Sequence, residues 1–328
     1  MTQLKRTMMN FAGSAAAVTL ALCAPAAHAQ NYPVKPVRLI APFPAGGSSD
    51  LIARIVAQRM TEGLSQQIII ENRPGAGSNL GTQVAARAAP DGYTLLITSV
   101  TAAINMTLYK NPGYDLLKDF TPISKLAVGP TALVVHPSVP ARNVREFIKL
   151  AQSRPGQLSY GSGGNGTPSH ICGEMLRHMA KVNVLHVPYK GTGQSVTDLM
   201  AGQIQFVFAS MPVAFPHMKT GRLRTLAVTG AARTPLAPDL PTVAESGIPG
   251  YAFDSWWGLV TNTGVTPAII NTLNIEVRRV LQLQDVKDRF ADLGIDVSQS
   301  SPAELTAFTR SEADRFAKII RDTGIKAD

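Results

Sequence analysis

Cysteine is scarce in this sequence: the 328 residues include only Cys23 and Cys172. Neither lies in a C-x-x-C pair or in a zinc-ligand spacing, which excludes the common redox and zinc motifs. The sequence also lacks a G-K-[ST] phosphate loop, a G-x-S-x-G nucleophile elbow and an H-E-x-x-H metal motif. We therefore expect no metal site, no cofactor and no catalytic residues.

Dense runs of basic residues are also missing, although the net charge is +9. Lysines and arginines are scattered along the chain and are not interleaved with aromatic residues. This distribution argues against a nucleic-acid partner. A modest excess of positive charge is better suited to attracting small anions.

The first 29 residues have the pattern of a secretory signal peptide. Lys5 and Arg6 precede the apolar run 15–22, and "AHA" stands directly before Gln30. This order predicts export and cleavage near Ala29 and Gln30, and the apolar run is too short for a membrane span. The alternative is a lipid-modified Cys23, for which the preceding leucine is a poor fit.

Beyond the signal peptide, short β-branched runs alternate with longer helical periods. This alternation predicts an α/β protein with largely parallel sheets flanked by helices. A proline-rich stretch at 233–251 is interpreted as a return crossing between two domains. The predicted organisation is a signal peptide at 1–29, domain 1 at 30–131 plus 252–328, and domain 2 at 132–251. Two crossings of this kind predict a hinge around a ligand cleft. The expected strands lie at 37–42, 67–72, 93–99, 125–138, 157–162, 183–189, 204–210, 223–229 and 256–262. The first expected helix follows the first strand and buries Leu51, Ile52, Ile55, Val56 and Met60. The other helices expected before the C-terminal ones lie at 77–88, 143–154, 168–180 and 193–202.

Two stretches, "APFPAGGSSDLIAR" (41–54) and "SYGSGGNGTPSHIC" (159–172), share one pattern. Each leads from a strand end through glycines with polar neighbours into the start of a helix. Free N–H groups and the helix dipole favour an anion at such a point. Either stretch alone is better explained by a simple capped turn, with Ser48 and Thr167 or Ser169 as caps. Because the two fall in different predicted domains, we expect them to hold one carboxylate between them.

Three other interpretations are weaker. "GSGGNG" (161–166) matches the dinucleotide fingerprint, but no acidic residue follows at the next strand end to bind a ribose. His170, Glu174 and His178 could share one helix face as metal ligands, although a charged exposed face is the simpler expectation. Asp50 lies in the first turn of a helix, where it could serve the helix dipole or face the ligand cleft.

The residues of these loops carry a family resemblance. "YPVKPVRLIAPFPAGGSSDLIARIVAQRM", "IIENRPGAGSNLGTQVAARAAPDGYTLL", "LSYGSGGNGTPSH" and "HVPYKG" resemble the Bug family, the substrate receptors of tripartite tricarboxylate transporters. The resemblance implies a periplasmic two-domain binding protein of type II that closes on a small carboxylate. It also implies that the partners are membrane transporter subunits. The ligand-binding residues carried over are Phe43, Ala45, Gly46, Ser48, Asp50, Ser162, Gly163, Asn165, Gly166, Thr167 and His170, to which we add Ser99 and Ser210 at strand ends.

The sequence leaves the ligand open among dicarboxylates, tricarboxylates, amino acids and aromatic acids. Phe43 beside the expected site slightly favours an aromatic or unsaturated acid. We expect a monomeric receptor and no enzyme. An exported enzyme acting on a small carboxylic acid remains the alternative, and it would need a nucleophile or metal set that the sequence does not display.

Overall fold

A computed structural model of the protein describes residues 32–327. The predicted signal peptide and its cleavage site lie outside the described residues. No helix between residues 32 and 327 is long and apolar enough to cross a membrane.

The elements alternate along the chain as the sequence pattern predicts. The strands are β1 (Val37–Ala41), β2 (Ile68–Asn72), β3 (Thr94–Ser99), β4 (Phe120–Val135), β5 (Ser159–Ser162), β6 (Leu185–Pro188), β7 (Phe206–Ser210), β8 (Arg224–Val228), β9 (Asp254–Asn262) and β10 (Asp296–Val297). The helices are α2 (Ser48–Leu64), α3 (Asn79–Ala86), α4 (Val100–Leu108), α5 (Val144–Ser153), α6 (Pro168–Met179), α7 (Thr192–Met200), α8 (Met211–Lys219), α9 (Pro267–Gln282), α10 (Gln284–Asp292) and α11 (Pro302–Thr323).

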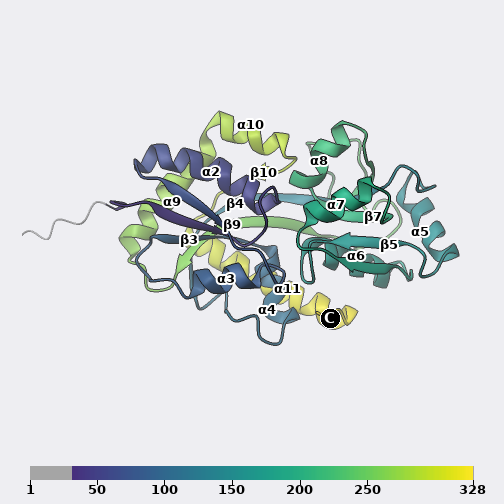
Figure 1. Ribbon diagram of the computed structural model, residues 1–328, viewed down its shortest axis with the longest axis horizontal. Helices are drawn as coiled ribbons and strands as arrows, with labels where there is room; N and C mark the ends of the chain where they lie inside the picture. The colour runs from purple at the N-terminus through teal and green to yellow at the C-terminus, as the bar shows by residue number, and fades with distance from the viewer. Residues whose placement is uncertain (1–31, 328) are drawn as a thin grey trace, which may run out of the picture. The chain divides into compact units, whose positions relative to one another are not determined.

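The long strand β4 belongs to two regions of the sheet (Figure 1). Its residues from Phe120 to Pro130 pair with β9, which continues into β3, β1 and β2. Its residues from Thr131 to Val135 pair with β7 and β8, and β7 continues into β5 and β6. We call these the first and the second sheet region. The predicted domain limit at residue 131 falls where β4 changes partners, and the division into separate domains stays a prediction.

The α/β class is as predicted, but the expectation of largely parallel sheets holds only for the outer strands of each region. The β1–β2, β1–β3, β5–β6 and β5–β7 pairs are parallel. In contrast, β4 and β9 run antiparallel to each other and to their other neighbours. The parallel strands that lead into helices therefore lie on both sides of the antiparallel pair β9 and β4, of which β4 belongs to both regions.

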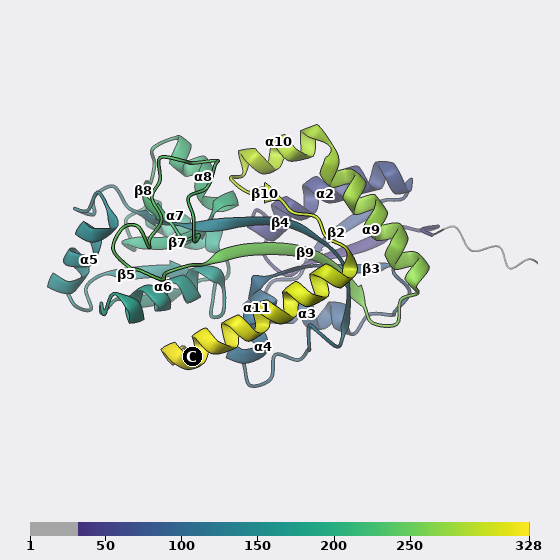
Figure 2. The same ribbon diagram turned by 180° about the vertical axis from the view of Figure 1, so that it is seen from behind.

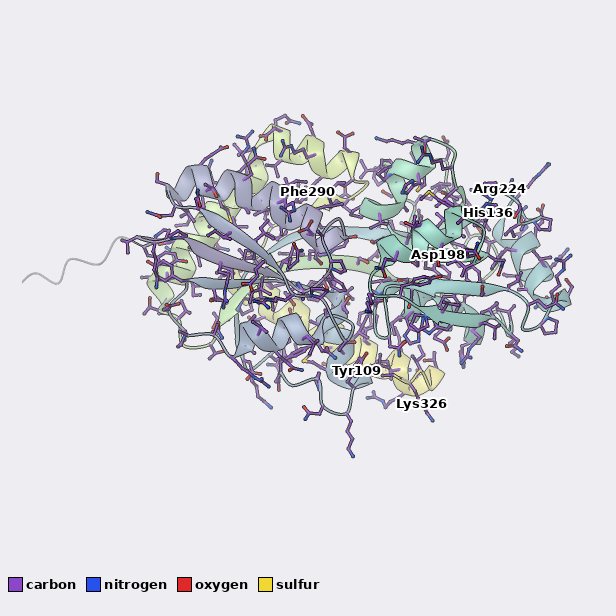
Figure 3. All side chains as sticks on the ribbon, in the orientation of Figure 1. Tyr109, His136, Asp198, Arg224, Phe290 and Lys326 are labelled. Carbon is purple, nitrogen blue, oxygen red and sulfur yellow. The ribbon has the colours of Figure 1, made fainter. Side chains whose placement is uncertain are left out.

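Helices bury their apolar stripes against both regions. In α2, the fully buried side chains of Ile52, Val56 and Met60 recur at helical spacing. Phe290 of α10 is also fully buried (Figure 3). On the opposite side, α11 packs against β4 and α4 (Figure 2). The indole Nε1 of Trp256 on β9 donates to Glu312 of α11 at 3.1 Å, which ties this helix to β9.

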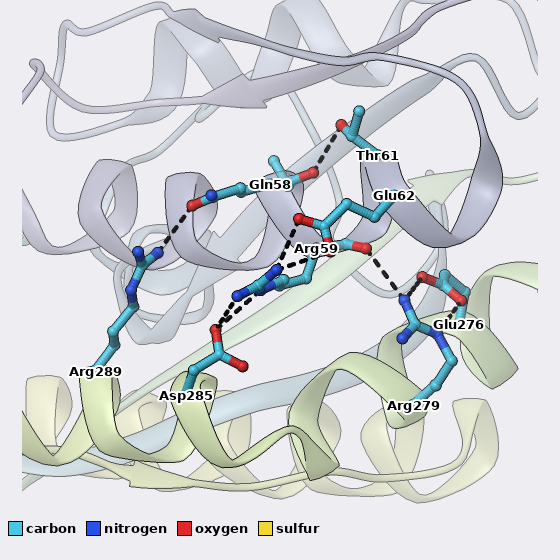
Figure 4. A network of polar contacts seen from close by, with 9 residues as sticks. Gln58, Arg59, Thr61, Glu62, Glu276, Arg279, Asp285 and Arg289 are labelled. Atoms are coloured by element: carbon cyan, nitrogen blue, oxygen red, sulfur yellow. Dashed lines mark hydrogen bonds and ion pairs between the residues drawn. The ribbon is translucent and has the colours of Figure 1, made fainter.

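An ionic network fixes the far end of α2 (Figure 4). Arg59 bonds Asp285 of α10 at 2.7 Å and Glu62 at 2.8 Å. Close packing supports these exposed pairs, because a Cβ atom on Gly63 would lie 2.1 Å from an oxygen of Glu276 on α9. Exposed ion pairs alone stabilise little, so the tight helix contact matters more. Together these contacts set the direction in which α2 presents its N-terminus.

Two helices, α4 and α8, were not expected from the sequence. Seven of the nine residues of α4 are buried, so it lacks the alternation of polar and apolar faces that reveals a surface helix. Helix α8 contains Pro216 in its interior, where proline ordinarily ends or interrupts a helix, whereas Pro212 lies in its first turn, where proline is tolerated. Both helices prove important for the site.

Candidate functional site

A cavity of 450 Å³ lies between the two sheet regions. Its wall combines glycines, small hydroxyl residues and a few apolar side chains. The lining residues are Phe43, Pro44, Ala45, Gly46, Gly47, Ser48, Ser49, Ser99, Val100, Thr101, Thr167, Pro168, Ser169, Gly191, Thr192, Gly193, Gln194, Thr197, Ser210, Ser255 and Trp257.

Five helices point their N-termini at this cavity. The N-cap residues of α2, α4, α6, α7 and α8 are Gly47, Ser99, Thr167, Gly191 and Ser210, and all five line the wall. Each helix follows directly the carboxyl end of a strand, β1, β3, β5, β6 or β7. Open α/β sheets place ligands at this edge. We call this arrangement the ring of helix ends.

The ring offers positive partial charge without any charged side chain. Among the residues that the structure describes, the wall contains no Lys, Arg, His, Asp or Glu. In the described chain, none of the three N-cap side chains, Ser99, Thr167 and Ser210, accepts a capping hydrogen bond from a backbone N–H of its own helix, and Gly47 and Gly191 have no side chain. Each helix start carries about half a unit of positive charge and N–H groups that have no intrahelical acceptor. The arrangement suits a small anion and provides no group for general acid–base catalysis.

Asp50 holds the loop before α2 in place from the side away from the cavity. Its carboxylate accepts hydrogen bonds of 2.9 Å from the Gly46 amide, from Arg54 and from the Asn72 side chain. The same Asn72 amide donates to the Phe43 carbonyl at 3.0 Å. Burial alone would raise the pKa of Asp50, but the bonds from Arg54, Gly46 and Asn72 outweigh it and leave the pKa lowered. Asp50 is therefore an ionised brace that shapes the loop and lies off the cavity wall.

Side chains from both sheet regions meet within the cavity. Ser48 of α2 and Ser210 at the start of α8 share a hydrogen bond of 2.6 Å between their hydroxyls. Trp257 on β9, paired in register with Ser99, contributes an aromatic side chain to the wall. Ser255 also lines the wall, and within the described residues its buried hydroxyl has no hydrogen-bond partner. These groups offer a bound acid both hydroxyl donors and an apolar contact.

The second glycine loop uses its own N–H groups internally. The Gly163 amide donates to Ser169 Oγ at 3.2 Å, and the Gly164 amide donates to Ser162 Oγ at 3.1 Å. The Gly166 amide donates to His170 Nδ1, also at 3.2 Å. These bonds make a rigid turn that carries Thr167 and the start of α6 to the wall. The amides after Gly163 therefore shape the loop, and the helix end beyond it faces the cavity.

His170 supports this loop as a neutral ring. It is buried and stacks on His186 with 4.5 Å between the ring centroids. Burial, and then the nearby His186 and Arg177, lower the pKa of His170 from 6.5 to about 3. A neutral Nδ1 can accept the Gly166 N–H, whereas a protonated ring could not.

We expect this histidine to make folding stability sensitive to acid. Because its pKa is lower in the folded state, its contribution is complete above pH 6.5 and is lost as the pH falls toward about 3. His170→Gln keeps an acceptor for Gly166 but cannot take up a proton. Thermal unfolding from about pH 7 to pH 4 should therefore show a smaller fall in melting temperature for the variant than for the wild type. Parallel curves for the two proteins would contradict this role.

The structure separates the predicted site residues into two groups. The residues on the cavity wall are Phe43, Ala45, Gly46, Ser48, Ser99, Thr167 and Ser210. Those off the wall are Asp50, Ser162, Gly163, Asn165, Gly166 and His170. The second group lies behind the first and positions it, as the hydrogen bonds of Asp50 and of the second glycine loop show. Contact with a ligand stays a prediction for every residue of both groups.

Sequence reasoning missed the third glycine loop. Gly191, Thr192 and Gly193 at the start of α7 line the wall together with Gln194. The segment "YKGTGQ" (189–194) lies between an expected strand and an expected helix, as the other two loops do, so the same signal was present. No sequence signal singles out Ser255, whose place on the wall depends on strand pairing.

Two of the α6 side chains that were considered as metal ligands, His170 and Glu174, have other partners in the structure. Glu174 accepts a 2.8 Å bond from Tyr160 and pairs with Arg177 at 2.8 Å. The expectation of an exposed charged face is wrong for His170 and Glu174, which are both buried. In residues 32–327, no group of three or more His, Cys, Asp or Glu side chains could hold a metal ion.

Comparison with known proteins agrees with the geometry of the cavity, which suits a small anion. A family model described as "Tripartite tricarboxylate transporter family receptor" matches residues 52–325. The chain belongs to this family. The predicted family resemblance is therefore confirmed, and the family consists of substrate-binding receptors rather than enzymes.

Solved structures of receptors with similar folds extend this finding. The periplasmic binding protein BugD is 31% identical, with a TM-score of 0.87 over 90% of this chain and 99% of its own. An R. palustris protein with adipate is 33% identical, with a TM-score of 0.87 over 90% of this chain and 99% of its own. MatC from Rhodopseudomonas palustris with bound malate is 31% identical, with a TM-score of 0.84 over 88% and 100%. The predicted fold class, an α/β periplasmic binding protein of two domains, is confirmed by these receptors.

Proposed function

We propose that this receptor captures a small carboxylate in the 450 Å³ cavity and delivers it, as a monomer, to the membrane subunits of a tripartite tricarboxylate-type transporter. The observation that carries the proposal is the ring of helix ends, which surrounds the cavity with N–H groups and hydroxyls and, among residues 32–327, with no charged side chain. The relatives with adipate and malate support a carboxylate as the anion.

We propose that the near carboxylate lies between the starts of α2 and α6. Ser48 and Thr167 mark these starts on opposite sheet regions. Each offers free amides in its first helical turn, and the dipoles of both helices favour the same negative charge. The starts of α4, α7 and α8 would then surround the rest of the ligand. A dicarboxylate is the class that this arrangement fits best, because helix ends lie around the whole cavity.

The alternative of an exported enzyme finds no support in the cavity. Acid–base or nucleophilic catalysis needs a titratable or activated group at the ligand. Among the described residues, no residue of the wall has an acidic, basic or histidine side chain. The serines of the wall therefore have no histidine or carboxylate partner there. Binding and release without chemical change is the function that remains.

The test is a thermal-shift panel with five acids from the open classes: malate, adipate, citrate, aspartate and benzoate. An acid at about a hundred times its dissociation constant should stabilise the protein by about 2.7 kcal/mol, which raises the melting temperature clearly. Mass spectrometry of the incubated acid should show no turnover. If none of the five acids raises the melting temperature, or if a bound acid is converted, the proposed function is wrong.

A further inference from the structure

A second contact between the two sheet regions lies outside the cavity. In the first region, Gly77 precedes α3, while Asn105 and Tyr109 lie on and just after α4. In the second region, Asn165 and Gly166 belong to the glycine loop before α6. Tyr109 donates its hydroxyl to the Asn165 carbonyl at 3.2 Å (Figure 3 labels Tyr109). We call these five residues the seam, and none of them lines the cavity wall.

Glycines at the seam allow an approach that any other residue would block. A Cβ atom on Gly77 would lie 2.3 Å from the Asn165 carbonyl oxygen. A Cβ atom on Gly166 would lie 1.9 Å from Asn105 Oδ1. Both glycines have left-handed backbones, with φ of +59° and +80°. Each region thus contributes one glycine and one oxygen, and each oxygen lies against the glycine of the other region.

The first-region side of the seam is rigid. Asn105 is fully buried, and its amide nitrogen donates to the Gly77 carbonyl at 2.7 Å and to Asn79 at 2.8 Å. Tyr114 donates to the same Asn79 oxygen at 3.1 Å. Within the described residues, Asn105 Oδ1 has no hydrogen-bond partner, and this oxygen faces Gly166 of the second region. A buried polar oxygen without a partner lowers the stability of the folded state. The position of this oxygen against the other region therefore needs a functional explanation.

The seam is connected to the cavity wall through both sheet regions. Gly166 directly precedes Thr167, the N-cap of α6 on the wall. Asn105 lies on α4, whose own N-cap Ser99 is on the wall as well. Contact at the seam therefore fixes the spacing between two members of the ring of helix ends.

We propose that the seam is a latch that forms when the two sheet regions close, and that it sets ligand affinity without touching the ligand. This inference rests on the proposed function. The latch favours the closed arrangement, and a ligand that binds only the closed arrangement gains affinity in proportion to the population of that state. Tyr109 and Gly77 are thus positioning residues for carboxylate binding.

The central test compares two glycine variants with similar backbone strain. Gly77→Ala places a methyl group against Asn165, whereas Gly221→Ala, at φ of +68°, meets no atom within 4 Å. The probe is whichever of malate, adipate, citrate, aspartate and benzoate gives the wild type the largest rise in melting temperature. We expect Gly77→Ala to bind it at least about tenfold more weakly than Gly221→Ala, because the methyl group keeps the seam open. Small-angle scattering should show that Gly221→Ala contracts with ligand and that Gly77→Ala does not.

Tyr109→Phe provides a milder variant that keeps the ring. Loss of its hydroxyl should weaken binding by about fivefold while leaving the ligand-free melting temperature unchanged. The double variant Gly77→Ala with Tyr109→Phe should bind no more weakly than Gly77→Ala alone, because a seam that is already open has no bond left to lose.

Three outcomes overturn the latch. They are equal affinities of Gly77→Ala and Gly221→Ala, wild-type affinity in Tyr109→Phe, and additive losses in the double variant. These results would leave the proposed function intact, since the wild type would still bind the acid. Failure of the wild type to bind any of the five acids would instead refute the proposed function, and the latch with it.

Discussion

Ser99→Asp should almost abolish carboxylate binding while leaving the protein folded. Ser99 is the N-cap of α4 and lies on a wall that carries no charged side chain among the described residues. Aspartate is a favourable N-cap, and its charge suits the helix dipole, so folding should be unharmed or improved. At about 5 Å and an effective dielectric constant of about 20, two negative charges repel by about 3 kcal/mol, which lowers affinity by about a hundredfold.

The matched control for this variant is Ser99→Asn. Asparagine has the shape of aspartate and also caps helices well, but it is neutral. Calorimetric titration of both variants with the best-binding acid separates charge from size. If Ser99→Asn loses as much affinity as Ser99→Asp, the loss is steric, and the ring of helix ends does not hold the anion near α4.

Gly163→Val should also eliminate binding, through a different cause. A Cβ atom on Gly163 would lie 2.8 Å from the Thr192 hydroxyl and 3.0 Å from the Thr192 amide nitrogen. The larger valine side chain must push the first turn of α7 away from the cavity. Overpacking of this kind costs about 1–3 kcal/mol in stability, and the displaced helix end no longer faces the ligand. We expect an affinity loss of more than about a hundredfold for the whole displacement.

Gly193→Val separates displacement from bulk at the same helix end. Gly193 lies in the first turn of α7, and a Cβ atom there would meet no atom within 4 Å. This variant should fold as the wild type does and lose less affinity than Gly163→Val. Isothermal titration of the two variants, with circular dichroism as a check of folding, makes the comparison. Wild-type affinity in a folded Gly163→Val protein would show that α7 has no part in binding.

Local sequence patterns predicted most of the fold because most elements follow local rules. The stripe of Ile52, Val56 and Met60 identifies α2. Runs of β-branched residues identify β1 and β2, which precede and follow α2 in the sequence and pair with each other. Helix α4 could not be found in this way, since tertiary burial on all sides erases the polar face on which the pattern depends. Helix α8 was missed because Pro216 lies inside it, against the local rule that proline interrupts a helix.

The candidate site was predictable only in its chemistry. Strand–glycine–helix patterns at Gly46 and Gly163 correctly point to helix starts. They do not tell which residue reaches the wall and which supports it from behind. His170 lies behind the wall because its ring accepts the Gly166 N–H, and Asp50 because three donors surround it. Such partners come from tertiary structure, and no single-sequence pattern contains them.

The seam shows the same limit more sharply. Gly77 reads as an ordinary turn glycine in "PGAGSNLG", and Tyr109 as an ordinary aromatic residue. Their significance depends on Asn165, 56 residues beyond Tyr109, which the fold brings to within hydrogen-bonding distance. Contacts between sheet regions are thus invisible to periodicity, even where they control how the regions close.

The central claim is that helix ends in this cavity hold the carboxylate of the ligand by its negative charge. The most direct measurement is isothermal titration of the wild type with the best-binding acid of the panel and with its methyl ester at the anchoring carboxylate. Hydrogen bonds to a charged group contribute about 1.5–3 kcal/mol each, so loss of two or more should weaken binding of the ester by at least about a hundredfold. An ester that binds as tightly as the acid would contradict the claim.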